Sequence, residues 1–470
     1  MFAQINQIIT VIDNAVWGMP LICLIMATGI FLTARLGLVQ IRHLGKAFKF
    51  MFKDEEDGHG EVTSFGALCT ALSATIGTGN IAGVATAIAV GGPGALFWMV
   101  LAAFFGMATK YSEGLLAIKY RTIDEDGHVL GGPFYYIENG MGKNWKWLAK
   151  LFAFFGAGVG LFGIGTFTQV NSIASAVKNF FDSNMAHTVA LFGGEYSWAT
   201  VIAGLILTLC VGLVVIGGIQ RISKVSEVVV PFMAVLYVGL ALIIIITNIT
   251  AVPGAFVTII KSAFTGSALA GGAVGSMFVA MQKGVARGIF SNESGLGSAP
   301  IAAAAARTKE PVRQGLVSMT GTFIDTIVIC TMTGLSIVIA GSWLNPDLEG
   351  VEITMDAFQK GLPFPGFVAT FSLMLCLVFF AFTTILGWDY YGERCVEYLF
   401  NKNKGVVKGY RWLYIIAVFI GPYMTVAAVW NIADIFNALM AFPNLIALLV
   451  LNGVVVKETK EFHAKHNGSY

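Results

Sequence analysis

The chain has 470 residues, of which 56% are hydrophobic and only 12% are charged, and its mean hydropathy is +0.76. A soluble domain carries about 25% charged residues, so this composition excludes a soluble enzyme and predicts a polytopic membrane protein. The net charge of +2 is too close to zero to favour a nucleic-acid partner. The six cysteines form no CxxC pair and are expected to be small buried apolar side chains.

Apolar windows along the chain predict an all-α membrane protein. A helix needs about 20 mainly apolar residues to cross a bilayer, and this criterion gives about eleven transmembrane helices. The predicted spans are residues 12–34, 65–90, 94–118, 149–177, 198–218, 225–247, 264–289, 316–341, 366–391, 411–429 and 432–455.

The distribution of basic residues predicts the orientation of these spans. If the N-terminus lies outside, only Lys178, Lys261 and Lys360 of the 29 lysines and arginines fall on the outer side. Such an asymmetry obeys the positive-inside rule. We therefore expect a multi-pass protein of the cell membrane with its N-terminus outside and its C-terminus in the cytoplasm.

The span over residues 65–90 contains the stretch "SATIGTGNIAGVATAIAVGGPG", with Gly77, Thr78, Gly79 and Asn80 in its interior. Each glycine costs a helix about 0.8–1 kcal/mol relative to alanine, and a buried amide without partners costs a few kcal/mol. Close helix packing can account for some of the glycines. The threonine and asparagine favour a helix that stops here to expose its backbone to a binding site.

Polar side chains in other spans are further site candidates. Gln169 falls deep in residues 149–177, where it could also bridge two helices. Thr383 and Thr384 lie deep in residues 366–391, where threonines can bond their own helix carbonyls.

Two acidic residues in the spans have alternative interpretations. Asp325 is expected near mid-membrane, either as a structural acid paired with a hydroxyl such as Thr326 or as a ligand of a second cation. Glu113 follows Lys110 by three residues, and this spacing on one helix face favours an ion pair at the inner interface.

The order of the spans indicates an internal repeat. After residues 1–62, which hold an extra helix and a basic linker, the spans divide into two sets of five, residues 63–250 and 251–456, followed by a cytoplasmic tail at 457–470. Because five is odd, the second set begins on the opposite side of the membrane. Each set starts with a glycine-rich span, which is typical of inverted-repeat transporters.

Four motifs carry a resemblance to a known family: residues 73–98, 131–140 ("GGPFYYIENG"), 284–300 ("GVARGIFSNESGLGSAP") and 380–393 ("FAFTTILGWDYYGE"). Together they resemble the alanine or glycine:cation symporter family over nearly the whole chain. The resemblance implies a five-plus-five, leucine-transporter-type fold preceded by one extra helix. It also implies sodium-driven uptake of alanine, glycine or similar small neutral amino acids, without a cofactor.

The resemblance implies a substrate site between the broken helices. Gln169 would contact the polar end of the substrate, and Trp388 would close a pocket for a small side chain. The residues expected to bind the substrate are Thr75, Thr78, Gly79, Asn80, Gln169, Gly275, Met277, Thr384 and Trp388.

The sodium ion is expected between the first broken helix and the span over residues 366–391. Its ligands would be the carbonyl oxygens of Ser73, Ile76 and Phe380 and the hydroxyls of Thr383 and Thr384. A set made only of oxygen atoms suits a hard cation. Asp325 is the candidate ligand for a second cation.

In the second glycine-rich span we expect the break at residues 271–276, next to Gly275 and Met277. The later segment "GVARGIFSNESGLGSAP" is then interpreted as a tight turn at the inner end. Arg287 and Glu293 would be gate partners in that segment. The reverse assignment, with the break in the later segment, is the alternative.

Other function classes fit less well. An ion channel needs a continuous filter, usually built by symmetric subunits. An intramembrane enzyme would need catalytic groups, and the sequence contains no HExxH motif and no evident nucleophile–base pair. A proton-coupled symporter, or a symporter of another small zwitterion, remains the alternative, and the sequence indicates no obligate protein partner.

Overall fold

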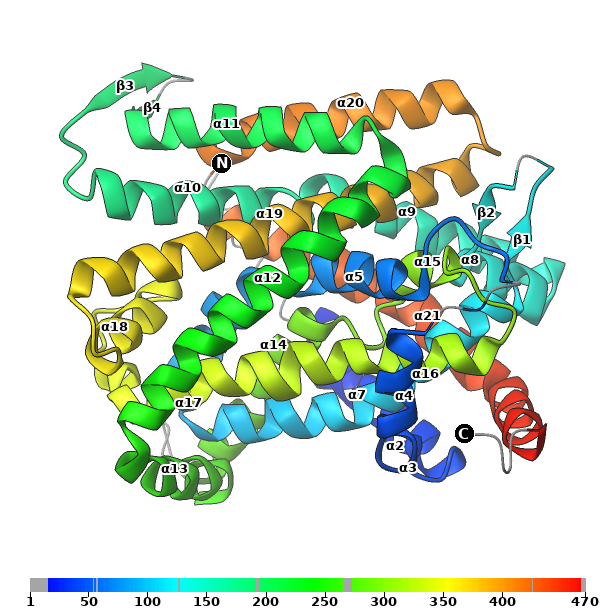
Figure 1. Ribbon diagram of the computed structural model, residues 1–470, viewed down its shortest axis with the longest axis horizontal. Helices are drawn as coiled ribbons and strands as arrows, with labels where there is room; N and C mark the ends of the chain where they lie inside the picture. Colours follow the sequence, from blue (N-terminus) through cyan, green and yellow to red (C-terminus); the bar gives the residue numbers. More distant parts are fainter. Residues whose placement is uncertain are drawn as a thin grey trace.

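The computed structural model describes residues 16–53, 55, 58–125, 127–191, 194–265, 273–424 and 426–465. Most of its long helices run along the longest axis of the molecule, as Figure 1 shows. Only two small antiparallel hairpins interrupt the helical pattern within these residues. The predicted all-α fold class is confirmed.

The first part of the chain contains the helices α2 to α12. Its α-helices are α2 (Met19–Arg35), α3 (Val39–Arg42), α4 (Leu44–Met51), α5 (Ser64–Thr75), α6 (Val84–Gly91), α7 (Gly94–Lys119), α8 (Pro133–Tyr136), α9 (Lys146–Phe162), α10 (Phe167–Phe181), α11 (Trp198–Val215) and α12 (Gly218–Thr247). Two π-helical segments, η1 (Gly79–Gly83) and η2 (Ile137–Met141), and a 3-10 turn, η3 (Lys143–Trp145), join some of them. The hairpins are β1 (Thr122–Ile123) with β2 (Val129–Leu130), and β3 (Thr188–Leu191) with β4 (Gly194–Ser197).

The second part of the chain contains a similar series. Its α-helices are α13 (Val252–Thr265), α14 (Ala273–Asn292), α15 (Ala299–Ala304), α16 (Pro311–Thr322), α17 (Thr331–Ala340), α18 (Val351–Gly361), α19 (Gly366–Leu399), α20 (Lys404–Ile420) and α21 (Val426–Lys465). A π-helical segment, η5 (Phe323–Cys330), joins α16 to α17, and short 3-10 turns are η4 (Ile249–Ala251), η6 (Ser342–Leu344) and η7 (Gly421–Tyr423).

Helices cover the predicted spans, although not all of them equally. Among the described residues, seven helices are long and apolar enough to cross a membrane, and the bent pair α5 and α6 makes an eighth. Two shorter apolar helices, Met19–Arg35 and Ile249–Thr265, lie outside this count. The span predicted over residues 149–177 is interrupted at 163–166, between α9 and α10.

The connecting segments gather at the two ends of the molecule. In Figure 1 the β3–β4 hairpin, α13 and α18 lie at one end, and the β1–β2 hairpin and α8 lie at the other. Two of the helices begin with side-chain caps of the usual kind: the hydroxyl of Thr63 accepts from Gly66 N at the start of α5, and that of Ser197 accepts from Ala199 N at the start of α11.

The centre of the molecule is built around α7 and α19. Helix α7 packs against α14 and α16, and α19 packs against α5, α9, α10 and α12. Glycines allow the approach of α14 to α7, because a Cβ atom at Gly284 would lie 2.2 Å from the carbonyl oxygen of Ala95. At least one of the glycines in this span therefore serves helix packing.

Candidate functional site

The first predicted break is present. Helix α5 ends at Thr75, and the chain resumes as η1 and α6 after a bend of 53°. Gly77 N donates to Asn80 Oδ1 at 2.8 Å, so the asparagine satisfies an amide that the broken helix releases. A Cβ atom at Gly77 would lie 2.5 Å from Thr384 Oγ1, which explains the glycine at this position.

The polar side chains predicted around this break differ in how they are used. Thr78 N donates to Gln169 Oε1 at 3.3 Å, so Gln169 lies at the break as expected. The hydroxyl of Thr78 is fully buried and has no hydrogen-bond partner among the described residues. The hydroxyl of Thr75 is already bonded to the carbonyl oxygens of Ala71 and Leu72. Thr78 is therefore the threonine with unused hydrogen-bonding capacity at the break.

Part of the predicted sodium cage is assembled. Thr384 Oγ1 lies 3.3 Å from Ile76 O and 2.9 Å from Phe380 O, which places three of the predicted oxygen ligands together. The hydroxyl of Thr383 donates to the carbonyl oxygen of Phe380 at 3.0 Å. The predicted ligand atom of Ser73 is its carbonyl oxygen; its hydroxyl donates to Thr70 O at 2.7 Å. The hydroxyls of Thr383 and Thr384 both reach Phe380 O of their own helix, but that of Thr384 also reaches Ile76 O.

The second break lies in a different place from the one predicted. Residues 271 and 272 are outside the described residues, but α14 is continuous from Ala273 to Asn292. The helix stops at residues 293–298 and resumes as α15. Gly275 and Met277 precede the end of α14 by about 25 and 22 Å at 1.5 Å per residue, so they do not belong to this break.

The later segment is thus the broken part of the helix and not an inner turn. Arg287 and Glu293 are not partners of each other: Arg287 Nη1 lies 3.6 Å from Asp434 Oδ2. Glu293 is fully buried, and its Oε2 accepts from Ser298 Oγ at 2.5 Å.

Left-handed residues and distant side chains form the second break. Gly295 and Gly297 have φ of 89° and 80°, values that favour glycine. Gly295 N donates to Glu113 Oε1 at 3.2 Å, and Asn444 Nδ2 donates to Gly295 O at 2.9 Å. Asn444 Nδ2 also donates to Glu113 Oε1 at 2.6 Å, so α7 and α21 hold the segment together.

This arrangement contradicts the expected ion pair of Glu113 with Lys110. Both side chains are buried, and no ion pair joins them in the described part of the chain. Glu113 is directed toward the second break and Lys110 toward a small cavity beside α16. The i,i+3 spacing was therefore not sufficient to predict a contact.

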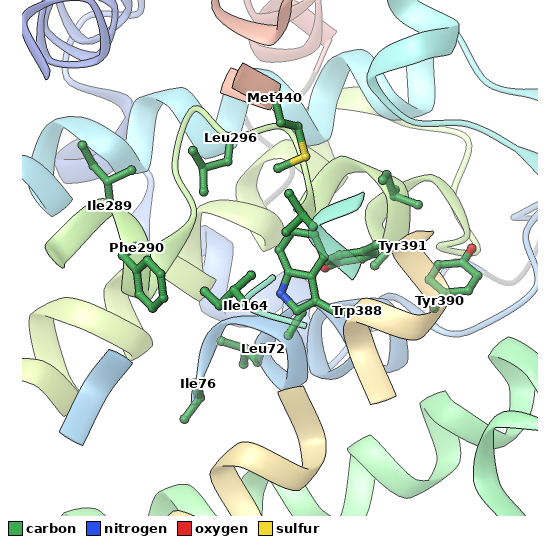
Figure 2. Packing of buried hydrophobic residues seen from close by; sticks show 14 of the residues in the cluster. Leu72, Ile76, Ile164, Ile289, Phe290, Leu296, Trp388, Tyr390, Tyr391 and Met440 are labelled. Atoms are coloured by element: carbon green, nitrogen blue, oxygen red, sulfur yellow. The ribbon is translucent and has the colours of Figure 1, made fainter. Parts of the chain in front are cut away.

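Trp388 lies beside both breaks. Its indole is fully buried, and its Nε1 donates to Glu293 Oε1 at 3.0 Å. Figure 2 shows the ring among apolar side chains that include Leu72, Ile164, Leu296 and Met440. The tryptophan thus connects an apolar region to the acidic residue of the second break.

Asp325 joins the two broken helices. Its Oδ1 accepts from Asn80 Nδ2 at 2.7 Å, and its Oδ2 accepts from Ser291 Oγ at 2.9 Å. Thr326 Oγ1 also donates to Asp325 Oδ2, at 2.6 Å, as the structural interpretation expected. Asn80 is consequently shared between Gly77 and Asp325, so its amide holds the break.

Sequence reasoning missed Ser291 and gave Glu293 only the role of a gate partner of Arg287. Glu293 and Ser291 lie in "IFSNESG", and only a structure shows that they meet Trp388 and Asp325. A signal was available for Glu293, because an ionisable residue within an apolar glycine-rich segment is a functional candidate by default.

Two interrupted helices that meet near the middle of a multi-pass bundle define the class of secondary transporters. The sequence profile of the sodium:alanine symporter family matches residues 2–469, and the chain belongs to that family. It is a transporter and not an enzyme.

Individual relatives agree with this assignment. The chain is 54% identical to an uncharacterized transporter of Haemophilus influenzae, with 97% of this chain and 96% of the relative covered. It is 49% identical to the sodium/alanine symporter AgcS of Methanococcus maripaludis, with 97% of each covered. It is 37% identical to the probable sodium/glutamine symporter GlnT of Bacillus subtilis, with 97% and 91% covered.

A solved structure supports the fold. The crystal structure of MhsT in complex with L-phenylalanine matches with a TM-score of 0.54 at 12% identity, over 85% of this chain and 99% of that one. MhsT has the leucine-transporter fold, so the predicted fold type is confirmed.

Proposed function

We propose that this chain couples sodium movement into the cell to the uptake of alanine, glycine or a similarly small neutral amino acid. The proposal rests on one observation above all: Thr384 Oγ1 lies against Phe380 O of its own helix and against Ile76 O at the first break. These three oxygens suit a sodium ion. Relatives named as sodium/alanine and sodium/glutamine symporters support the same chemistry.

The amino acid is proposed to bind across the first break. The N-terminal end of η1 and α6 carries partial positive charge and favours the carboxylate, whereas the C-terminal end of α5 favours cations. Thr78, Gly79 and Gln169 would contact the polar end of the substrate. Thr75 would contribute little through its hydroxyl, and Asn80 would act by holding the break.

Trp388 is proposed to limit the size of the substrate side chain. Its indole is held by Glu293 and surrounded by apolar residues, so the ring cannot move aside without losing the Nε1 hydrogen bond. A hydrogen or methyl side chain would fit next to it. Asp325 would position both breaks and would be available to a second cation.

The route from one side is proposed to pass through a cavity of about 650 Å³ at the α18 end of the molecule. Its lining includes Thr86, Ser172, Ser175, Arg287 and Glu349. The ion pair of Arg287 with Asp434 lies at this cavity and is a candidate barrier between it and the site.

The topology is part of the same proposal. Residues 63–250 and 251–456 would form the two inverted halves, after the extra helix within 1–62 and before the tail at 457–470. The protein would lie in the cytoplasmic membrane. The α18 end would face the outside of the cell, and the β1–β2 end would face the cytoplasm. A fluorescent protein fused after Tyr470 should fluoresce, whereas a periplasmic alkaline phosphatase fused there should stay inactive.

The function is tested in proteoliposomes. Uptake of radiolabelled alanine should follow an imposed inward sodium gradient and stop when the gradient is absent. Glycine should compete with alanine, and phenylalanine should not. Uptake that follows a proton gradient at constant sodium would contradict the sodium coupling, and uptake without any gradient dependence would contradict symport.

A further inference from the structure

A strongly basic cavity lies at the end of the molecule that carries the β1–β2 hairpin, and it shares no lining residue with the two breaks. Its volume is about 490 Å³, and it is lined where α11 ends, where α19 ends and where α20 begins. Five of its lining residues are lysine or arginine, and one, Glu397, is acidic. A concave surface of this charge attracts anions.

The two arginines of this cavity already have acidic partners. Arg394 Nη1 lies 2.8 Å from Glu397 Oε2, and Arg411 Nη2 donates to Glu393 Oε2 at 2.7 Å. Because each arginine is balanced by a carboxylate, the excess positive charge of the cavity comes from its three lysines.

These lysines are Lys402, Lys404 and Lys408. All three are exposed, and no ion pair joins them to an acidic residue in the described part of the chain. Lys404 is the first residue of α20, whose first turn contains no acidic residue. The N-terminal end of a helix carries partial positive charge, which disfavours cations and favours anions. A bound anion would therefore stabilise both the lysines and the start of α20.

Apolar side chains continue from the cavity along the outside of two helices. Helices α11 and α20 pack against each other and lie along one edge of the molecule (Figure 1). Ile216 and Trp412 line the cavity and are 54% and 51% exposed. Leu213 and Ile416, about one turn further along α11 and α20, are exposed as well. The mouth of the cavity thus combines positive charge with an apolar surface.

This combination favours a lipid over a free anion. The predicted spans 198–218 and 411–429 place Ile216 and Trp412 at the membrane boundary, where tryptophan is enriched and where lipid headgroups lie. A free phosphate ion would leave the apolar surface uncovered, whereas acyl chains would cover it. Basic pockets between transmembrane helices on the cytoplasmic side are suited to anionic headgroups.

We propose that the cavity at the ends of α11, α19 and α20 binds an anionic phospholipid. Lys402, Lys404 and Lys408 contact the phosphate of the headgroup. The acyl chains lie along Ile216 and Trp412. The inference goes beyond transport and uses the proposed topology only to assign the site to the cytoplasmic leaflet.

The experiment measures the binding of phosphatidylglycerol with a fluorescent acyl chain to the full-length protein in detergent micelles, without sodium or alanine. Unlabelled phosphatidylglycerol should displace the probe from a saturable site. Equal concentrations of phosphatidylcholine, whose headgroup has no net charge, and of inorganic phosphate should not displace it. This competition series separates a lipid from a free phosphate as the source of the anion.

Lys402→Gln/Lys404→Gln/Lys408→Gln removes the three unpaired charges of the cavity. Affinity for phosphatidylglycerol should fall at least about tenfold, because a lysine near an anionic headgroup is worth about fivefold in affinity. Lys408→Glu, which places a carboxylate in the cavity, should have an effect of similar size and serves if the triple variant does not fold.

The matched control is Lys143→Gln/Lys150→Gln/Lys460→Gln, which removes three exposed lysines that do not line the cavity. The net charge changes by the same amount, but the affinity should change by less than about twofold, since exposed charges beyond the Debye length are screened. The comparison separates a specific site from general attraction between a basic surface and an anionic lipid.

Each result decides the inference. Equal losses in the cavity and control variants would overturn it, as would unchanged binding in Lys408→Glu. Displacement of the probe by phosphatidylcholine or by inorganic phosphate would also overturn it, and this measurement uses the unaltered protein. A protein that binds the lipid in this way but shows no sodium-driven uptake would contradict the proposed function and leave the lipid site standing.

Discussion

The two interrupted helices meet at one site, yet they are stabilised in different ways. No residue of the first break has a positive φ, and Asn80, three residues away, accepts the released Gly77 amide. The second break contains left-handed Gly295 and Gly297 and depends on Glu113 and Asn444, which lie far away in the sequence. The first break also bonds the distant Gln169 and Asp325, but Asn80 within its own segment makes it recognisable there. The second break has its main side-chain support on distant helices and cannot be recognised in this way.

The largest effect is expected when a methyl group is added to each break in turn. In Gly297→Ala the Cβ atom would lie 2.7 Å from Phe152 Cε2, at a φ of 80°. Strain and overpacking together should cost about 3 kcal/mol or more. In Gly79→Ala the nearest atom is Ser291 Cα at 3.3 Å, so the loss should be smaller. Thermal unfolding of the two variants in detergent measures the difference, and equal losses would contradict it.

The next effect concerns the distant support of the second break. Glu113→Ala leaves Gly295 N without its acceptor and removes one of the two acceptors of Asn444 Nδ2, which should cost about 1–3 kcal/mol. Glu113→Gln keeps an acceptor oxygen and should lose less. The effect of both variants is measured by thermal unfolding and by alanine uptake. The comparison fails if Glu113→Gln is as unstable as Glu113→Ala.

At the first break, Thr384→Ala removes the hydroxyl that lies against Ile76 O and Phe380 O. The sodium concentration for half-maximal uptake should rise about tenfold, equivalent to about 1.4 kcal/mol. Thr383→Ala is the matched control, because the carbonyl oxygens that its hydroxyl reaches belong to its own helix, whereas the hydroxyl of Thr384 also reaches Ile76 O at the first break. Unchanged sodium activation in Thr384→Ala would remove this residue from the proposed cage.

Substrate selectivity tests the role of Trp388, which lies beside both breaks. Trp388→Phe shortens the ring and removes the hydrogen bond to Glu293. Uptake of 2-aminobutyrate relative to alanine should rise about fivefold, since a methylene group is worth about 1–3 kcal/mol in discrimination. Competition assays measure this ratio. A ratio equal to that of the wild type would argue against the indole as the size limit.

The smallest effect is expected at His128, in the β1–β2 hairpin, which contacts Glu61 just before α5. Hydrogen bonds with Glu397 and Glu61 raise the pKa of His128 to about 9, and Arg394 is the nearby cation. Because the folded-state pKa lies above the usual value near 6.5, this stabilisation is complete at lower pH and is lost as the pH rises through about 9. His128→Gln should lower the melting temperature by a few degrees at pH 6 and by nothing at pH 10. A difference independent of pH would exclude a charged His128.

Much of the fold and half of the site followed from the sequence. The first break, Gln169 and Thr384 were recognisable because glycine, amide and hydroxyl groups within an apolar span are costly unless they are used. The carbonyl oxygens of Ile76 and Phe380 were implied only by the resemblance to the symporter family. The unusual residue types can be recognised within their own segments of the sequence, without knowledge of distant contacts. The distance from Thr384 Oγ1 to Ile76 O agrees with that reasoning.

The second break could not be located in the same way. Glycines occur throughout residues 271–297, and their composition does not separate packing from a break. Gly284 faces Ala95 of α7, whereas Gly295 and Gly297 adopt left-handed backbone geometry. What distinguishes them is contact with Glu113 and Asn444, and contacts between distant residues have no signature in a single sequence.

The π-helical segment η1 has a consequence for how the protein moves. A widened turn of this kind displaces carbonyl groups from the usual helical pattern. Thr333 Oγ1 donates to Asn80 O at 2.8 Å, and Thr354 Oγ1 donates to Ile81 O at 3.1 Å. These two hydroxyls tie the start of α6 to α17 and α18. We therefore expect that a tilt of α6 moves α17 and α18 together with it.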